Sequence, residues 1–197
     1  MNFVTTHLEV RNTPDCRAKQ MEAIVTALRE ANAPRPTIIA GDFNSNTFAR
    51  GGMLRTFSGF ARLMFSEPDK LRQAIAAPQA REPLFALLEK LGFTDKSFNS
   101  SDVTCYVPLK ILEDSSKLPG FLTTAIARQI ARYNGQLDFR LDWLIGRCVK
   151  ALGDGEMIDT ASQCASRKPQ TISGLRNEMG GQITDHDPIT VDLRLAY

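Results

Sequence analysis

The pattern of apolar and polar positions predicts alternating strands and helices at the start of the chain. Residues 3–10 are β-branched and apolar, as in a strand, and residues 37–40 form a short apolar run typical of a buried strand. Between them, Thr13 and Pro14 suit the N-cap and first position of a helix, which a proline-containing segment at 33–36 ends. The expected apolar face of this helix consists of Met21, Ile24, Val25 and Leu28. The order strand, helix, strand indicates an α/β fold, in which functional groups favour the carboxyl ends of strands.

Helical spacing dominates the middle of the chain, and strand-like runs return in its last third. One amphipathic face is expected from Met53, Leu54, Phe57, Phe60, Leu63 and Met64. The further expected elements are a helix at 83–91, a short strand at 105–107, an amphipathic helix at 121–133, a strand within 137–149 and a final alternating strand at 189–195.

Composition narrows the class of protein only moderately. The chain has 197 residues, of which 43% are hydrophobic and 23% are charged, values typical of one soluble globular domain rather than a disordered chain. The net charge of +2 is too small to indicate a nucleic-acid-binding protein by itself. No apolar stretch approaches the roughly 18 residues of a membrane span, so we do not expect a membrane protein. The four cysteines lie far apart without a CxxC pair, which favours a reducing compartment and a cytoplasmic location.

The first candidate site follows the second predicted strand. In Gly41-Asp42-Phe43-Asn44, the side chains of Asp42 and Asn44 leave the same face of an extended segment. A carboxylate beside a carboxamide suits the orientation of water and the donation of a hydrogen bond to an oxyanion. The alternative interpretation is an Asx turn, in which both side chains bind only the backbone.

Two further candidate groups lie in the last third of the chain. Carboxylates flank His186 in the segment 184–188, which suits either a divalent metal with a nearby imidazole or a turn fixed by a proline. Asp142 lies inside an apolar strand, where a charge is costly unless it is paired. A histidine would be a natural partner, and Arg140 or Arg147 would be the local alternative.

Four short segments occur in an order that resembles the endonuclease/exonuclease/phosphatase superfamily, which includes deoxyribonuclease I and inositol-phosphate phosphatases. They are Thr5-Thr6-His7-Leu8-Glu9, Gly41-Asp42-Phe43-Asn44, Arg140-Leu141-Asp142-Trp143 and Asp185-His186-Asp187-Pro188. The resemblance covers the chain apart from a mainly helical insertion at about 45–135, where only residues 91–95 and Thr104-Cys105 are similar. It implies a single domain over residues 1–197 with the two-sheet α/β sandwich of the deoxyribonuclease I-like type.

The resemblance implies hydrolysis of a phosphate ester by in-line attack of water. Asp42 would orient or deprotonate the water, and Asn44 would donate to a non-bridging oxygen of the substrate. His186, polarised by Asp142, would stabilise charge on the phosphoryl oxygens. Positioning and charge stabilisation are what phosphoryl transfer requires of a protein.

The remaining implied roles concern the metal and the substrate. Mg²⁺ or Mn²⁺ would be the cofactor, and Asp185 would help to hold it. His7 would lie across the cleft as general acid or phosphate contact. Arg140 is expected, with Asn44, to bind the substrate.

The chain departs from the superfamily at its start. Members normally have an upstream segment that carries an early Asn and the Glu that is the main metal ligand. We therefore expect an N-terminally truncated or split protein, with poor turnover by the chain alone and an N-terminal partner segment.

The substrate class stays open at this point. The segments 43–66, 117–137 and 160–177 contain basic residues, and they could attract a polyanion such as nucleic acid or simply be solvated. A phosphodiester is the favoured substrate. The alternatives are a phospholipid or sugar-phosphate phosphatase, and a non-catalytic binding or regulatory protein.

Overall fold

The computed structural model describes residues 1–10, 12–33, 35–45, 67–108, 124, 128, 131–132, 136–159, 164–181 and 183–195. The predicted amphipathic face at 53–64 lies outside these residues, as does most of the predicted helix at 121–133. Both therefore stay predictions.

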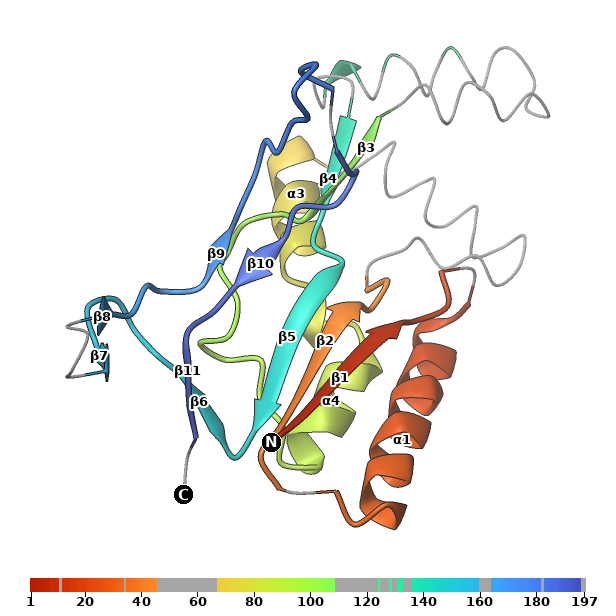
Figure 1. Cartoon of the computed structure of the whole chain (residues 1–197). Helices are drawn as coiled ribbons and strands as arrows, with labels where there is room; N and C mark the ends of the chain where they lie inside the picture. Colours follow the sequence, from red (N-terminus) through yellow and green to blue (C-terminus); the bar gives the residue numbers. More distant parts are fainter. Residues whose placement is uncertain are drawn as a thin grey trace.

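A three-stranded sheet forms the centre of the described fold (Figure 1). β1 (Asn2–His7) runs parallel to β2 (Thr37–Asp42), and β5 (Asp142–Arg147) lies antiparallel on the other side of β2. The helix α1 (Pro14–Glu30) connects the two parallel strands. The predicted order of strand, helix and strand is thus confirmed, although β1 ends at residue 7 and not at residue 10.

Local sequence signals account for α1. The Thr13 hydroxyl accepts a hydrogen bond from the amide of Cys16 at 3.3 Å, and Pro14 occupies the first turn. Met21 and Val25 are fully buried against the sheet, and Ile24 packs against the same core from a half-buried position. The predicted helix is confirmed, as is the buried face of Met21, Ile24 and Val25, whereas the fourth predicted residue of this face, Leu28, is half-buried and lies outside the core cluster.

The sheet is covered on one face by two helices. In Figure 1, α4 (Pro83–Lys90) lies behind the strands and α1 lies beside β1, and side chains of both helices pack in one core cluster with Ile39, Trp143 and Ile145. A buried ion pair joins the helical layer, because an Nη of Arg17 lies 2.6 Å from an Oε of Glu82. The opposite face of β2 and β5 is covered by side chains as well. Because both faces of these two strands are covered, their central residues form continuous apolar runs.

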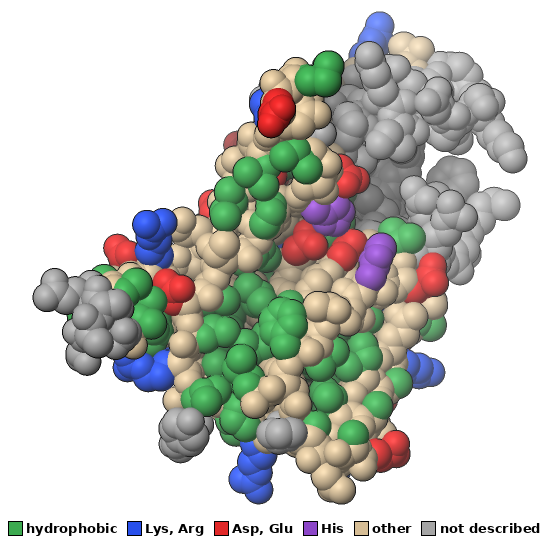
Figure 2. Space-filling model, viewed as in Figure 1, with side chains coloured by type: hydrophobic (Ala, Val, Ile, Leu, Met, Phe, Trp, Pro, Cys, Tyr) green, Lys and Arg blue, Asp and Glu red, His purple; other side chains and the backbone are tan. Residues whose placement is uncertain are grey.

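The opposite face of the sheet carries a smaller apolar cluster. Ile38 and Leu144 point to this side and pack with Phe98 and with the antiparallel pair of β6 (Val149–Ala151) and β11 (Leu193–Leu195). Figure 2 shows hydrophobic side chains gathered over this face.

The remaining elements are α3 (Pro68–Ala76), the 3-10 helix η1 (Pro78–Ala80), β3 (Cys105–Pro108), β4 (Gln136–Phe139), β7 (Met157–Asp159), β8 (Cys164–Ala165), β9 (Gln170–Thr171) and β10 (Ile189–Thr190). They form the two-stranded pairs β3–β4, β7–β8 and β9–β10.

The last third of the chain contains more strands than the sequence pattern predicts. The strand expected within 137–149 is confirmed as β5, and the same segment also contains most of β4, which pairs with β3 whereas β5 pairs with β2, and the start of β6. Cys148 has a positive φ of 54°, which separates β5 from β6. The strand expected at 189–195 is likewise β10 and β11, which pair with different partners.

The wider architecture is only partly described. Within the described residues, the strands form one three-stranded sheet and four two-stranded pairs, and the expected two-sheet sandwich stays a prediction. The described part of the expected insertion contains α3, η1 and α4, followed by a loop and β3. Among the described residues, no helix is both long and apolar enough to cross a membrane.

Candidate functional site

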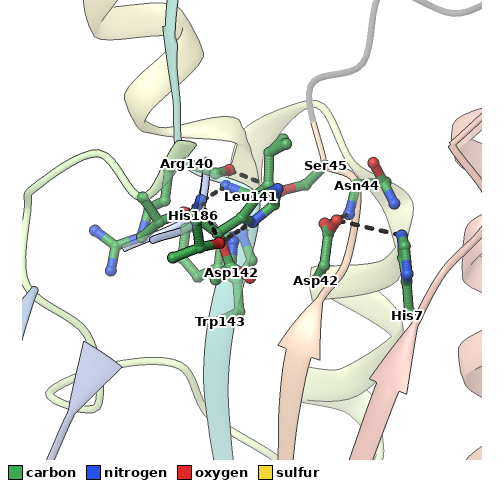
Figure 3. A network of polar contacts seen from close by, with 11 residues as sticks. His7, Asp42, Asn44, Ser45, Arg140, Leu141, Asp142, Trp143 and His186 are labelled. Atoms are coloured by element: carbon green, nitrogen blue, oxygen red, sulfur yellow. Dashed lines mark hydrogen bonds and ion pairs between the residues drawn. The ribbon is translucent and has the colours of Figure 1, made fainter. Parts of the chain in front are cut away.

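Strand register brings three of the predicted site residues into one row. His7 ends β1, Asp42 ends β2 and Asp142 begins β5, and the register pairs His7 with Asp42 and Asp42 with Asp142. Residues that are paired across a sheet leave the same face. The Nε2 of His7 lies 3.4 Å from Oδ2 of Asp42 (Figure 3). These residues therefore lie at the edge where the parallel strands β1 and β2 finish, as the strand order predicts.

A glycine permits this close approach. Gly41 has a φ of +134°, and a Cβ atom at this position would lie 2.0 Å from the backbone oxygen of Thr6. A side chain here would push β1 away from β2. The glycine thus allows Asp42 to lie beside His7.

His186 completes the row from a distant part of the chain. Its Nδ1 lies 2.7 Å from Oδ2 of Asp142, 44 residues earlier in the sequence. The loop that carries His186 is bound to β3: Cys105 and His186 form an antiparallel bridge, and the Asp187 amide donates to the Thr104 carbonyl at 2.7 Å. The histidine partner proposed for Asp142 is thus the one that the structure provides. His7, Asp42, Asp142 and His186 together are called the row.

Thr104 supports the row without belonging to it. Its hydroxyl oxygen accepts hydrogen bonds from the amides of Leu141 and Asp142, each at 3.1 Å. These bonds fix the backbone where β5 begins and hence the origin of the Asp142 side chain. The Thr104-Cys105 match within the insertion is the only sequence signal for this role.

Asn44 is buried, and its contacts position other groups. Its backbone amide donates to Oδ1 of Asp42 at 2.8 Å, which is the Asx-turn contact, and its side-chain amide donates to the Leu8 carbonyl at 2.6 Å. The residue is 2% exposed and has a φ of 48°. These contacts hold Asp42 and the end of β1 in place. The expected donation from Asn44 to a substrate oxygen stays a prediction.

Arg140 is buried as well. Its guanidinium stacks 4.6 Å from the centre of the Trp143 ring and donates to the Ser100 carbonyl, and the residue is 3% exposed. The Trp143 indole donates to the Ser45 hydroxyl at 2.8 Å, which in turn donates to the Arg140 carbonyl at 3.2 Å. These contacts give Arg140 a structural role in the core, and the expected contact of Arg140 with a substrate stays a prediction.

The predicted metal ligand lies beside the row but does not complete a metal centre. Asp185 is exposed, and its backbone carbonyl accepts from the Tyr106 amide at 3.4 Å. Within the described ranges, no group of three or more His, Cys, Asp and Glu side chains is placed to hold a metal ion. Asp42 and Asp142 are a neighbouring carboxylate pair, a donor type that Mg²⁺ uses together with water and substrate oxygens. These residues alone do not form a metal centre.

The environment of Asp42 suits a proton acceptor. Burial raises the pKa of the Asp42 carboxyl above its ordinary value of 3.8, and the neighbouring Asp142 raises it further. The hydrogen bond from the Asn44 amide, together with His186 and His7, opposes this increase. A carboxylate whose pKa is moved towards neutrality is a better general base than a solvated one.

The environment of His186 holds it in the charged form. The hydrogen bond with Asp142 is the main cause that raises the pKa of His186 from 6.5 to about 11, followed by the effect of the neighbouring Cys105 thiol, whereas burial opposes the increase. The imidazole is therefore protonated at neutral pH. It presents a fixed positive charge beside Asp42.

The two histidines at the ends of the row are more exposed than the two carboxyl groups between them. The side chain of His7 is 73% exposed and that of His186 is 29% exposed, whereas Asp42 and Asp142 lie deeper. In Figure 2 the two histidine side chains flank acidic side chains above the apolar patch. A ligand could thus contact both imidazoles and the carboxylate between them.

No family model, curated protein or solved structure matches this chain. A function is therefore inferred from the geometry of the row and from the order of the motifs.

Proposed function

We propose that this protein is a phosphoesterase that hydrolyses a phosphate ester, preferably a phosphodiester, by in-line attack of water. The observation that carries this proposal is the row of His7, Asp42, Asp142 and His186 across one end of the sheet. Together with the four ordered motifs, the row supports membership in the endonuclease/exonuclease/phosphatase superfamily and its two-sheet sandwich fold.

Asp42 is the group that we assign to the nucleophilic water. It is a partly sheltered carboxylate with a raised pKa, and its second oxygen is fixed by the Asn44 amide. In the reaction Asp42 accepts a proton from water while the water oxygen forms a bond to phosphorus. The bond from phosphorus to the leaving oxygen breaks in the same displacement.

His186 is the group that we assign to charge on the phosphoryl oxygens. Its Nδ1 is held by Asp142, so the ring has a fixed orientation and its Nε2 is the remaining polar atom. A protonated imidazole at this place donates a charge-assisted hydrogen bond to a phosphoryl oxygen. Loss of one such donor costs on the order of a hundredfold in rate.

His7 is placed for the leaving group or for a second phosphate contact. It is the most exposed member of the row and lies on the other side of Asp42 from Asp142. In the proposed reaction His7 donates a proton to the leaving oxygen, which balances the proton taken up by Asp42.

A divalent cation, Mg²⁺ or Mn²⁺, is part of the proposal because the motifs resemble those of metal-dependent enzymes. When bound, such a cation would neutralise charge on the substrate phosphate. Asp185 and the carboxylate pair of Asp42 and Asp142 are the candidates to contribute ligands. This requirement is tested directly by adding either metal or a chelator.

The test measures cleavage of supercoiled plasmid DNA and of bis-p-nitrophenyl phosphate by the purified chain, with Mg²⁺, Mn²⁺ or EDTA. The variants are Asp42→Asn and His186→Ala, and the matched control is Asp154→Asn, which changes an exposed carboxyl in the turn after β6. We expect each row variant to lose at least about a hundredfold in rate while the control retains the wild-type rate. Metal-stimulated cleavage that is equal in the wild type and both row variants would refute the assignment.

A further inference from the structure

A second concave region lies at the opposite end of the sheet from the row. It is a cavity of about 600 Å³ that is lined by residues from the end of α1, the segment before β2 and the end of β5. Asp142 begins β5 and Arg147 ends it, and five residue steps along a strand span roughly 17 Å. One phosphate group therefore cannot contact both the row and this cavity.

Three arginines from separate segments line the cavity. Arg29 lies in the last turn of α1, Arg35 lies just before β2, and Arg147 is the last residue of β5. Asn32 adds a side-chain amide, and no Asp or Glu is among the described residues of the lining. The three guanidinium groups form no hydrogen bond or ion pair with any described residue. The cavity thus gathers positive charge without a protein partner for it among the described residues.

Two details make the cavity suitable for an anion. The guanidinium of Arg147 stacks 4.6 Å from the centre of the Phe93 ring, which restricts its orientation before any ligand binds. The carbonyls at the end of α1 would repel an anion, but those of Leu28 and Arg29 already accept hydrogen bonds at 3.0 Å from the amides of Ala33 and Asn32.

We propose that this cavity binds the phosphate group of a small molecule, independently of the phosphoesterase activity proposed for the row. Guanidinium groups match phosphate oxygens with paired N–H donors, and this cavity is lined by arginines from three separate segments. A tetrahedral phosphate dianion has enough oxygens for all three, whereas a planar carboxylate is satisfied by a single guanidinium. The volume of about 600 Å³ also leaves room for the body of a small phosphate ester.

The test is isothermal titration calorimetry of the purified chain with inorganic phosphate at constant ionic strength, with acetate as the carboxylate probe. The variants are Arg35→Gln and Arg147→Gln, and the matched control is Arg167→Gln, an exposed arginine outside the cavity. We expect saturable binding of phosphate that each cavity variant weakens by at least about tenfold and that the control leaves unchanged. Because Arg147 packs on Phe93, Arg35→Gln is the variant that tests the site without a risk to the fold.

The double variant Asp42→Asn with His186→Ala separates this site from the row. We expect it to bind phosphate as the wild type does, even where it abolishes hydrolysis. The proposal is overturned by any of three results: phosphate binding that the row variant removes and Arg35→Gln leaves intact, acetate binding as tight as phosphate binding, or no saturable phosphate binding at all.

Discussion

The contact between Asp142 and His186 leads to a prediction that needs no knowledge of the substrate. The two side chains are joined by a 2.7 Å hydrogen bond in which the imidazole is protonated. Asp142→Asn removes the negative charge but keeps a side chain of the same size. We expect the pKa of His186 to fall in this variant and the folded state to lose stability.

The magnitude follows from the strength of a charged hydrogen bond. Such a bond contributes about 1.5–3 kcal/mol, and one pKa unit corresponds to about 1.4 kcal/mol, so the loss of this bond should lower the pKa by at least about one to two units. Folding raises the pKa of His186, so the protonated imidazole stabilises the folded state. This contribution is complete at pH values below the ordinary pKa of 6.5, and it is lost as the pH rises through about 11. The loss of unfolding free energy in Asp142→Asn should therefore be about 1.5–3 kcal/mol below pH 6.5 and much smaller at the highest pH values.

The assay is an NMR titration of the imidazole resonances, combined with chemical denaturation at several pH values. The chain contains only two histidines, so His7→Ala identifies the signal of His186 without further assignment. Asp154→Asn serves as the control that removes one negative charge elsewhere. The reasoning is refuted if His186 of the wild type titrates near 6.5, or if Asp142→Asn and the control give the same titration curve.

Three further predictions concern the fold around the row. Gly41→Ala should lower the free energy of unfolding, measured by chemical denaturation, by at least about 2 kcal/mol, because the added Cβ meets a backbone oxygen. Gly155 also has a positive φ but has no atom within 4 Å of such a Cβ, so Gly155→Ala should cost less stability. Arg17→Met should lower the free energy of unfolding by about 3–5 kcal/mol, because Glu82 stays buried without its ion pair with Arg17. The additional change Glu82→Leu should recover much of this stability, and equal stability of the single and double variants would contradict the reasoning. Thr104→Val should cost about 1–3 kcal/mol and shift the NMR signal of His186, since two amides lose their acceptor at the start of β5; an unchanged signal would count against its positioning role.

The parts of the fold that local signals specify were predictable from the sequence. Thr13 and Pro14 mark the start of α1 through their own backbone preferences, and the spacing of Met21 and Val25 reports the face that the helix buries. The division of residues 137–149 was not predictable in this way. It depends on a change of partner from β3 to β2, and the partners lie far away along the chain.

The candidate site shows the same limit. The motifs identify His7, Asp42, Asp142 and His186, and an Asp in an apolar strand requires a partner, so the pair of Asp142 with His186 could be anticipated. The inward position of Arg140 could not be anticipated, because its stacking on Trp143 depends on the tertiary packing of the core. Local sequence thus identified the charged groups, whereas tertiary contacts determined which of them are exposed.

The charges of the row place a condition on its function. Of the side chains Asp42, Asp142 and His186, two are acidic groups and only one is a basic group. A phosphate ester is itself an anion and would be repelled by such a group at close range. In the proposed reaction, binding would therefore be favoured by His7, which lies 3.4 Å from Asp42 and is the most exposed side chain of the row, and by a cation that arrives with the substrate. The two carboxyl groups to which we assign the water and the orientation of His186 thus also give the proposed metal dependence a basis in the geometry of the strands.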